Sequence, residues 1–148
     1  MIEIFTAVSR AVADPTRVRI LKMVEAGELC VCQITAILGL SSATVSKHLS
    51  LLKMAGFLTQ RKEGRWIYYR LVGREMNPYA PSMLALLSGF LDDDPVVEED
   101  RRRLGLVNAL TVQTLCRMGP HPFDSDGDID PAVFELDAEE RRRQAATA

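Results

Sequence analysis

Apolar residues at the start of the chain recur every three or four positions, which is the spacing of an amphipathic helix. This pattern predicts a first helix from Ile2 to Ala13. A second helix is expected to begin at Asp14-Pro15, because an aspartate N-cap followed by proline at the first helical position favours a helix start. It should end at Gly27, where glycine interrupts the pattern.

Two further helical segments follow, one over residues 31–38 and one that Ser41 caps and Gly56 ends. The apolar residues of the latter form a single stripe, so its opposite face should be exposed. Only Gly39-Leu40 separates the two segments, which is typical of a helix-turn-helix.

After Gly56 the pattern changes from helical spacing to runs of aromatic and branched residues. Residues 57–62 and 65–71 are predicted to be strands, and Glu63-Gly64 between them is a two-residue hairpin signal. We expect that Trp66 and Tyr68 face one side of this hairpin and Ile67 and Tyr69 the other, with one pair in the core.

Helical patterns return over residues 79–91 and 96–118. The fold class is therefore mainly α with a β-hairpin, a winged helix-turn-helix over residues 1–91 with a C-terminal helical extension over residues 92–118. From residue 119 on, proline, glycine and aspartate predict an acidic, disordered tail. Its aspartates are spaced as in a calcium loop, but Ile129 stands where that loop needs glycine, which favours a solvated tail.

The net charge of −2 hides an asymmetry between the two halves. Residues 1–75 hold 11 basic and 6 acidic residues, whereas residues 76–148 hold 7 basic and 14 acidic residues. A basic half can bind phosphate backbones although the whole chain is slightly acidic. The longest apolar stretch is too short for a membrane helix, and three cysteines indicate free thiols, so we expect a soluble, cytoplasmic protein.

The exposed face of the second helix of the helix-turn-helix carries small hydroxyl and basic groups suited to base edges and phosphates in a major groove. An ordinary polar helix face is the alternative. The hairpin tip adds basic residues that would reach flanking phosphates or the minor groove. The candidate DNA-binding residues are Ser42, Thr44, Ser46, Lys47, His48, Ser50, Lys53, Arg61, Lys62 and Arg65.

Cys30 and Cys32 stand one residue apart at the start of the helix over residues 31–38. A helix N-terminus lowers a thiol pKa and favours the thiolate that binds soft metals, although free cysteines are often just small buried residues. Side chains at i and i+2 of a regular helix point about 200° apart, so one ion could bind both only if that turn unwound. This geometry suggests that ligand binding and DNA binding compete.

Several short motifs make residues 3–91 resemble the ArsR/SmtB family of metal-sensing repressors. They are Ala13-Asp14-Pro15-Thr16-Arg17, Glu28-Leu29-Cys30-Val31-Cys32, Leu40-Ser41-Ser42, Val45-Ser46-Lys47-His48-Leu49, Leu52-Lys53-Met54-Ala55-Gly56, and Arg61 through Gly64-Arg65 to Tyr68-Tyr69. The resemblance implies a homodimer joined by its first and last core helices. Such a dimer binds an inverted-repeat operator in double-stranded DNA and is released by a metal or metalloid.

The resemblance also assigns Cys30 and Cys32 as inducer ligands. In the arsenic sensors of the family a third cysteine commonly follows three residues after the second, but here that position is Thr35. Cys116 is the remaining sulfur of the three cysteines, and it either completes the site, within the subunit or across the dimer, or takes no part in it.

The first hypothesis is a repressor of an arsenical-resistance operon that As(III) or Sb(III) releases. Cd(II), Pb(II) or Zn(II) is the alternative inducer. A second hypothesis replaces the metalloid by an oxidant or reactive sulfur. A thiol enzyme fits less well, because the sequence has no anion-cradling loop and no Cys-x-x-Cys on a βαβ unit, so we expect that the protein is not an enzyme.

Overall fold

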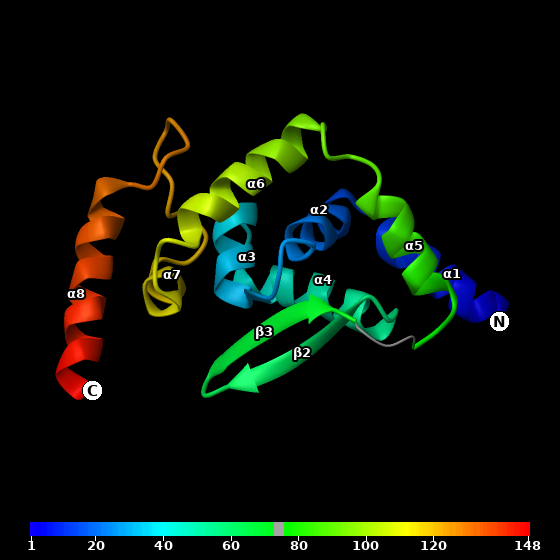
Figure 1. Cartoon of the computed structure of the whole chain (residues 1–148), viewed down its shortest axis with the longest axis horizontal. Coiled ribbons are helices and arrows are strands. Elements are labelled where there is room, and N and C mark those ends of the chain that lie inside the picture. The colour runs from blue at the N-terminus through cyan, green and yellow to red at the C-terminus, as the bar shows by residue number, and fades with distance from the viewer. Residues whose placement is uncertain (73–75) are drawn as a thin grey trace.

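A computed structural model describes residues 1–72 and 76–148 of the chain. Its elements, in chain order, are α1 (Ile2–Val12), α2 (Pro15–Val24), β1 (Leu29–Cys30), α3 (Val31–Leu38), α4 (Ser42–Met54), β2 (Leu58–Glu63), β3 (Trp66–Leu71), α5 (Tyr79–Ser88), α6 (Pro95–Val107), α7 (Val112–Met118) and α8 (Pro131–Thr147). Helices α1 and α5 lie together near the N-terminus, and α8 lies at the opposite end (Figure 1). We call residues 1–72 the winged region and residues 92–148 the extension.

The predicted helix-turn-helix is confirmed as α3 and α4. Gly39 ends α3 in the left-handed conformation with φ 66°, which glycine adopts without strain. Ser41 then starts α4, since its side chain accepts a hydrogen bond from the backbone N–H of Thr44. The two helices pack against each other across this short turn.

The predicted hairpin is confirmed as β2 and β3, which pair antiparallel with Glu63 opposite Trp66. The sequence did not predict the third strand, β1, which adds to the other edge of β3 and gives the order β1-β3-β2. In this pairing Cys30 lies opposite Tyr68. The segment that carries the first thiol is therefore part of the wing sheet.

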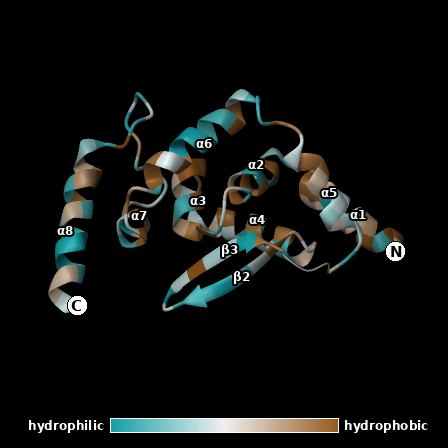
Figure 2. Ribbon diagram, in the orientation of Figure 1, coloured by the Kyte–Doolittle hydropathy of each residue, from teal (hydrophilic) through white to brown (hydrophobic). Residues whose placement is uncertain are grey.

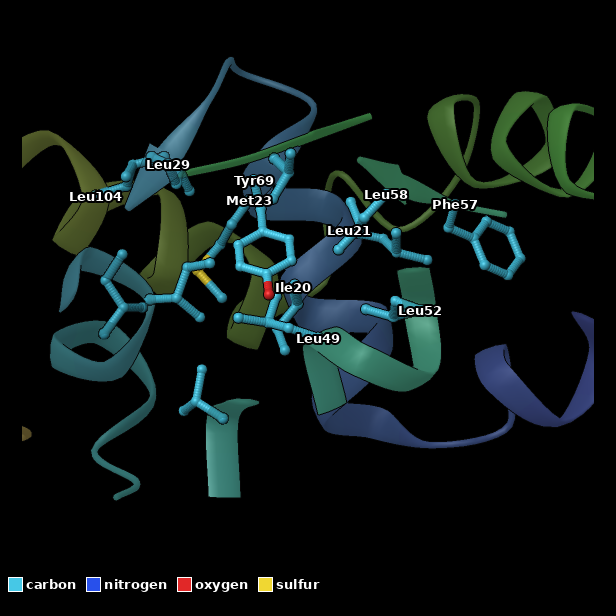
Figure 3. Packing of buried hydrophobic residues seen from close by; sticks show 14 of the residues in the cluster. Ile20, Leu21, Met23, Leu29, Leu49, Leu52, Phe57, Leu58, Tyr69 and Leu104 are labelled. Carbon is cyan, nitrogen blue, oxygen red and sulfur yellow. The ribbon is translucent and has the colours of Figure 1, made fainter. Parts of the chain in front are cut away.

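The core lies between the sheet and the helices around it. Figure 3 shows the ring of Tyr69 from β3 among the side chains of α2, namely Ile20, Leu21 and Met23. Tyr69 is buried and Ile67 packs against the same core, so this pair of the hairpin faces inward as expected. Leu104 of α6 belongs to the same hydrophobic cluster, which means that the extension shares the core of the winged region.

Two expectations for the extension were wrong. Residues 96–118 form two helices instead of one, because the chain turns after Val107 and Thr111 caps a new helix by accepting a hydrogen bond from the N–H of Thr114. Residues 131–147 form α8 where a disordered tail was expected. Asp130 caps this helix, and Val133 is fully buried in the shared core, so the segment has the apolar contact that ordering requires.

Two ion pairs join α2 to the extension. Arg19 donates two hydrogen bonds of 2.8 Å to the buried carboxylate of Asp100 on α6. Lys22, whose side chain is 2% exposed, contacts Asp92 at 3.0 Å and Glu25 at 2.9 Å. Burial lowers the pKa of Lys22, but the hydrogen bonds to Glu25 and Asp92 outweigh it and raise the pKa.

The hydropathy of the residues differs between the elements of the structure. In Figure 2 the strands of the hairpin carry mostly hydrophilic residues near the tip, whereas α1 and α5 carry many hydrophobic ones.

Within the described part of the chain, none of the helices combines the length and the hydrophobicity that crossing a membrane demands.

Candidate functional site

Three cysteines that lie far apart in the sequence, two in the first half of the chain and one in the second, meet at one place. The sulfur atoms of Cys30, Cys32 and Cys116 all lie within 4.8 Å of one another. Cys30 is buried, whereas Cys32 and Cys116 are half-buried. We call these three side chains the thiol cluster. Its donors are three soft sulfurs, and no His or carboxylate of the described residues belongs to it.

The expectation that Cys30 and Cys32 point away from each other was wrong. Cys30 does not lie within a helix: it ends β1 and is the N-cap of α3, with extended dihedrals of φ −75° and ψ 149°. Only Cys32 lies in the first turn of α3, so the helical i, i+2 geometry does not apply. Both thiols can therefore reach one ligand while α3 stays intact.

The expected effect of the helix N-terminus on Cys30 is also outweighed. Burial raises the pKa of the Cys30 thiol. The backbone N–H groups of Cys32, Val31 and Ile67 lower the pKa, but by less than burial raises it. Metal or metalloid binding at this sulfur must displace its proton.

A side-chain network fixes the backbone around the cluster. Gln33 accepts a hydrogen bond of 2.8 Å from the N–H of Cys30 and donates one of 2.9 Å to Asn108. It thereby joins the start of α3 to the end of α6. Sequence reasoning did not select Gln33 or Asn108, although glutamine at the third position of a helix is a recognisable capping signal.

Cys116 enters from α7, which packs on α3. In the structure Cys116 forms a disulfide with Cys32, with 5.1 Å between the two Cα atoms, and Cys30 is the free thiol. The pair closes a sequence separation of 84 residues. The thiol cluster is thus formed jointly by the winged region and the extension.

The predicted DNA-contact residues of α4 are displayed as expected, with one exception. Ser42, Ser46, Lys47, Ser50 and Lys53 are exposed, as is Thr44, whose hydroxyl lies 2.9 Å from that of Ser41 within the cap. His48 is half-buried, and its Nδ1 lies 3.3 Å from the Arg17 guanidinium of α2. The geometry turns His48 toward α2 as well as toward the exposed face.

The predicted wing residues divide into two kinds. Lys62 and Arg65 are exposed at the hairpin tip, and the Arg65 guanidinium lies 5.0 Å from the centre of the Trp66 ring. Arg61 instead contacts Glu28 at 2.7 Å and Glu63 at 2.7 Å. Hydrogen bonds to Glu28 and then to Glu63 raise the pKa of Arg61. Its charge is already compensated within the protein.

Arg61 also lies over the Tyr68 ring, with 4.5 Å from its guanidinium carbon to the ring centre. Cys30 and Arg61 are both opposite Tyr68 in the sheet, on β1 and β2 respectively. One row across three strands therefore connects a thiol of the cluster with a cation of the wing. Glu28, which directly precedes β1, accepts a hydrogen bond from Arg61 and forms a second connection to β2.

The comparisons with known proteins point to one family. Residues 14–60 match the model described as bacterial regulatory protein, arsR family. An HTH-type transcriptional regulator of Methanocaldococcus jannaschii is 47% identical over 64 residues, which are 43% of this chain and 72% of that protein. This chain belongs to the ArsR family. The fold and the family are those of transcriptional regulators and not of enzymes.

Two other similar proteins add detail. The arsenic resistance transcriptional regulator ArsR1 of Pseudomonas putida is 43% identical over 87 residues, and the match spans 57% of this chain and 64% of that protein. A homodimeric winged helix-turn-helix DNA-binding domain from Mycobacterium bovis superimposes with a TM-score of 0.51 at 28% identity. That superposition covers 60% of this chain and 78% of the other, and it confirms the winged helix-turn-helix fold.

Proposed function

We propose that this ArsR-family regulator is a homodimeric repressor that binds operator DNA with α4 and the wing. We further propose that As(III) or Sb(III) releases it by binding the thiol cluster in its reduced form, in which Cys32 and Cys116 are thiols. The observation that carries the proposal is the convergence of three sulfurs within 4.8 Å. Trivalent metalloids are thiophilic, so a site made only of cysteine sulfur fits their chemistry. The similarity to an arsenic resistance regulator points in the same direction.

Cd(II), Pb(II) and Zn(II) are the alternative ions for the same cluster. Zinc in proteins is almost always four-coordinate, and the cluster offers three sulfurs with no carboxylate or imidazole of the described residues beside them. An ion that binds three donor atoms therefore suits these three sulfurs better than an ion that prefers four donors in a tetrahedron.

DNA binding is proposed from the exposed groups of α4 and the hairpin tip. Lys47 and Lys53 are exposed on α4, and Lys62 and Arg65 on the wing. Cations that are not tied to protein carboxylates can neutralise phosphates and release counterions, which makes binding dependent on salt. The operator of a two-fold symmetric dimer is expected to be an inverted repeat.

The dimer is proposed to form through α1 and α5. Apolar side chains of these helices are exposed in the single chain: Phe5 is 52% exposed and Leu86 is 55% exposed. Phe5 packs edge-on against Tyr79 with 5.3 Å between ring centres, which joins the two helices into one apolar face. An exposed apolar face of this kind favours association with a second copy.

Release is proposed to act through the sheet. A ligand that draws Cys30 toward Cys32 and Cys116 pulls on β1, which is hydrogen-bonded to β3 of the wing. Cys32 belongs to α3, the first helix of the helix-turn-helix. A shift of either element changes how the wing and α4 sit relative to each other, and so biases the protein between DNA-binding and released arrangements.

The test is to replace each cysteine by serine, which keeps the size and removes the soft thiolate. Cys30→Ser and Cys32→Ser should each retain operator affinity and lose release by arsenite, and Cys116→Ser should weaken the response strongly. Operator binding is measured by fluorescence anisotropy on a labelled DNA fragment that contains the operator. The buffer contains a phosphine reductant, which supplies no thiolate. A Cys30→Ser protein that still dissociates at the wild-type arsenite concentration would refute the proposal.

A second candidate, a thiol redox switch, is favoured by the disulfide between Cys32 and Cys116. In this reaction hydrogen peroxide oxidises two thiols to one disulfide and is itself reduced to two molecules of water. The two candidates predict different cysteine requirements, because only the metalloid needs Cys30. The redox switch is supported if hydrogen peroxide still releases the Cys30→Ser protein from the operator. In that case it should no longer release the Cys32→Ser or Cys116→Ser protein.

A further inference from the structure

Cys116 is the member of the thiol cluster whose position depends on the extension. It lies on α7, a helix of seven residues. A helix this short is not stable alone, because nucleation fixes several residues for very few hydrogen bonds. The packing of α7 on other elements must therefore decide where its thiol lies.

Helix α7 is held from one side by α3, which carries Cys32, and from the other side by α8. The carboxylate of Asp137 on α8 accepts hydrogen bonds of 2.8 Å from the backbone N–H of Thr111 and of 2.8 Å from the hydroxyl of Thr114. Thr111 is the N-cap of α7, and Thr114 precedes Cys116 by two residues. Asp137 thus fixes the first turn of the helix that presents the third sulfur.

These groups are buried, which makes their pairing necessary. Thr114 is 0% exposed and Asp137 is 6% exposed. Burial raises the pKa of Asp137, but hydrogen bonds from Thr111, Arg141 and Thr114 outweigh it and lower the pKa to about 2. If this buried hydroxyl and this buried carboxylate were separated, each would lose a hydrogen bond that water cannot readily replace, so the pair resists separation.

Further contacts tie α8 to both ends of α7. Arg141 binds Asp137 at 2.7 Å and donates a second hydrogen bond of 2.9 Å to the carbonyl of Ala109. Arg117, which follows Cys116 directly, contacts Glu140 at 3.1 Å. Val133 and Asp137 are the buried residues of α8, and residues 141–148 are all exposed. The polar contacts of α8 with other elements described above all go to α7 and the turn before it.

We propose that α8 is a clamp for the third thiol and that Asp137 is a positioning residue of the thiol cluster, setting the place of Cys116 relative to Cys30 and Cys32. This inference rests on the proposed function, because it assigns the extension a role in inducer binding. Residues that orient ligands without touching the bound ion typically change affinity by about 10- to 100-fold when they are removed. Asp137 should act entirely through Cys116 and leave the DNA-binding surface unaffected.

The experiment compares Asp137→Ala and Asp137→Asn in the full chain, each with Cys116 present and with Cys116→Ser. Reduced protein is titrated with arsenite, and the sulfur-to-arsenic charge-transfer absorption reports both the affinity and the number of bound sulfurs. We expect Asp137→Ala to weaken arsenite binding by about 10- to 100-fold. Asp137→Asn, which keeps one acceptor oxygen, should lose less, and neither change should matter once Cys116 is serine.

Glu139→Gln is the matched control, because Glu139 is on the same helix and its ion pair with Arg143 is exposed and lies within α8. Arsenite affinity should be unchanged in this variant. Operator affinity without arsenite should be equal in all variants, which separates positioning from a general loss of folding.

The outcomes distinguish the clamp from the proposed function. Three-sulfur binding in the wild type that Asp137→Ala leaves unchanged overturns the clamp alone. A loss of operator affinity in Asp137→Ala, or an equal loss of arsenite affinity with and without Cys116, overturns it as well, since Asp137 would then act on the whole fold. A wild-type protein whose arsenite binding is insensitive to Cys116→Ser contradicts the three-sulfur site itself, whatever Asp137 does.

Discussion

The winged region and the extension differ in charge, in likeness to known proteins and in what they give to the thiol cluster. The winged region contains the match to the ArsR family, and it carries the exposed cations of α4 and the hairpin tip and two of the three cysteines of the cluster. The extension belongs to the acidic half and supplies the third thiol. The difference shows that a cluster of three cysteines can be formed jointly by two parts of the chain, neither of which completes it alone.

The junction between the two regions consists of polar contacts as well as core. Asp100 of α6 is buried against Arg19 of α2, and Gln33 of α3 bonds to Asn108 at the end of α6. Leu104 and Val107 add apolar contact to the same cluster as the winged region. The extension is thus docked on the winged region through both polar and apolar contacts.

The largest effect is expected at the ion pair between the two regions. Arg19→Met leaves the Asp100 carboxylate buried without a partner, which should destabilise the protein by about 3 to 5 kcal/mol. Urea unfolding measures the change. Arg19→Met combined with Asp100→Leu should recover most of the loss, because no charge is then buried. A cost below about 1 kcal/mol for the single change would mean that the Arg19–Asp100 ion pair does not hold the extension in place.

The next effect concerns DNA and separates the two regions by charge. Lys47→Ala should weaken operator binding by about 1 to 3 kcal/mol if Lys47 reads a base, and flatten its salt dependence if it holds a phosphate. Arg142→Ala removes an exposed cation from the extension instead and should leave affinity unchanged. Anisotropy titrations at several salt concentrations measure both. Equal losses in the two variants would show that the extension also contacts DNA.

A smaller effect is expected from acid. The pKa of Asp137, lowered to about 2, means that its contribution to stability is present above the unfolded value of about 3.9 and is lost as the pH falls toward 2. The Arg141 side chain is 57% exposed, so screening by solvent reduces this contribution, and we expect about 1 kcal/mol. The difference in unfolding free energy between wild type and Asp137→Asn should therefore shrink between about pH 4 and pH 2. A constant difference contradicts the assignment.

The smallest effect should come from Arg61, the wing cation that the protein itself compensates. Because Arg61 is bound to Glu28 and Glu63, Arg61→Gln should leave operator affinity nearly unchanged. Arg65→Ala at the hairpin tip is the comparison and should cost more for all DNA sequences alike. If Arg61→Gln weakens binding as much as Arg65→Ala, the Glu28 pairing gives way to phosphate when DNA binds.

The sequence predicted the winged region well because its signals are local. Asp14-Pro15 starts α2, Ser41 caps α4 and Gly64 turns the hairpin, and each acts within a few residues. The same kind of signal stands at Asp130-Pro131, where α8 begins. Its acidic and proline-rich surroundings favoured disorder instead, since the buried contact of Val133 with the core does not appear in the local pattern.

Sequence alone determined the helix-turn-helix, the hairpin, the basic surface and the motifs that identify the family, because periodicity, caps and turns depend on neighbours along the chain. Tertiary structure decided that Cys30 ends a strand, that Arg61 is paired with Glu28, and that Cys116 lies beside Cys32. The last contact joins residues separated by 84 positions, and it depends on α6, α7 and α8 docking in turn. Contacts of this kind arise from packing among distant segments, which no local pattern encodes.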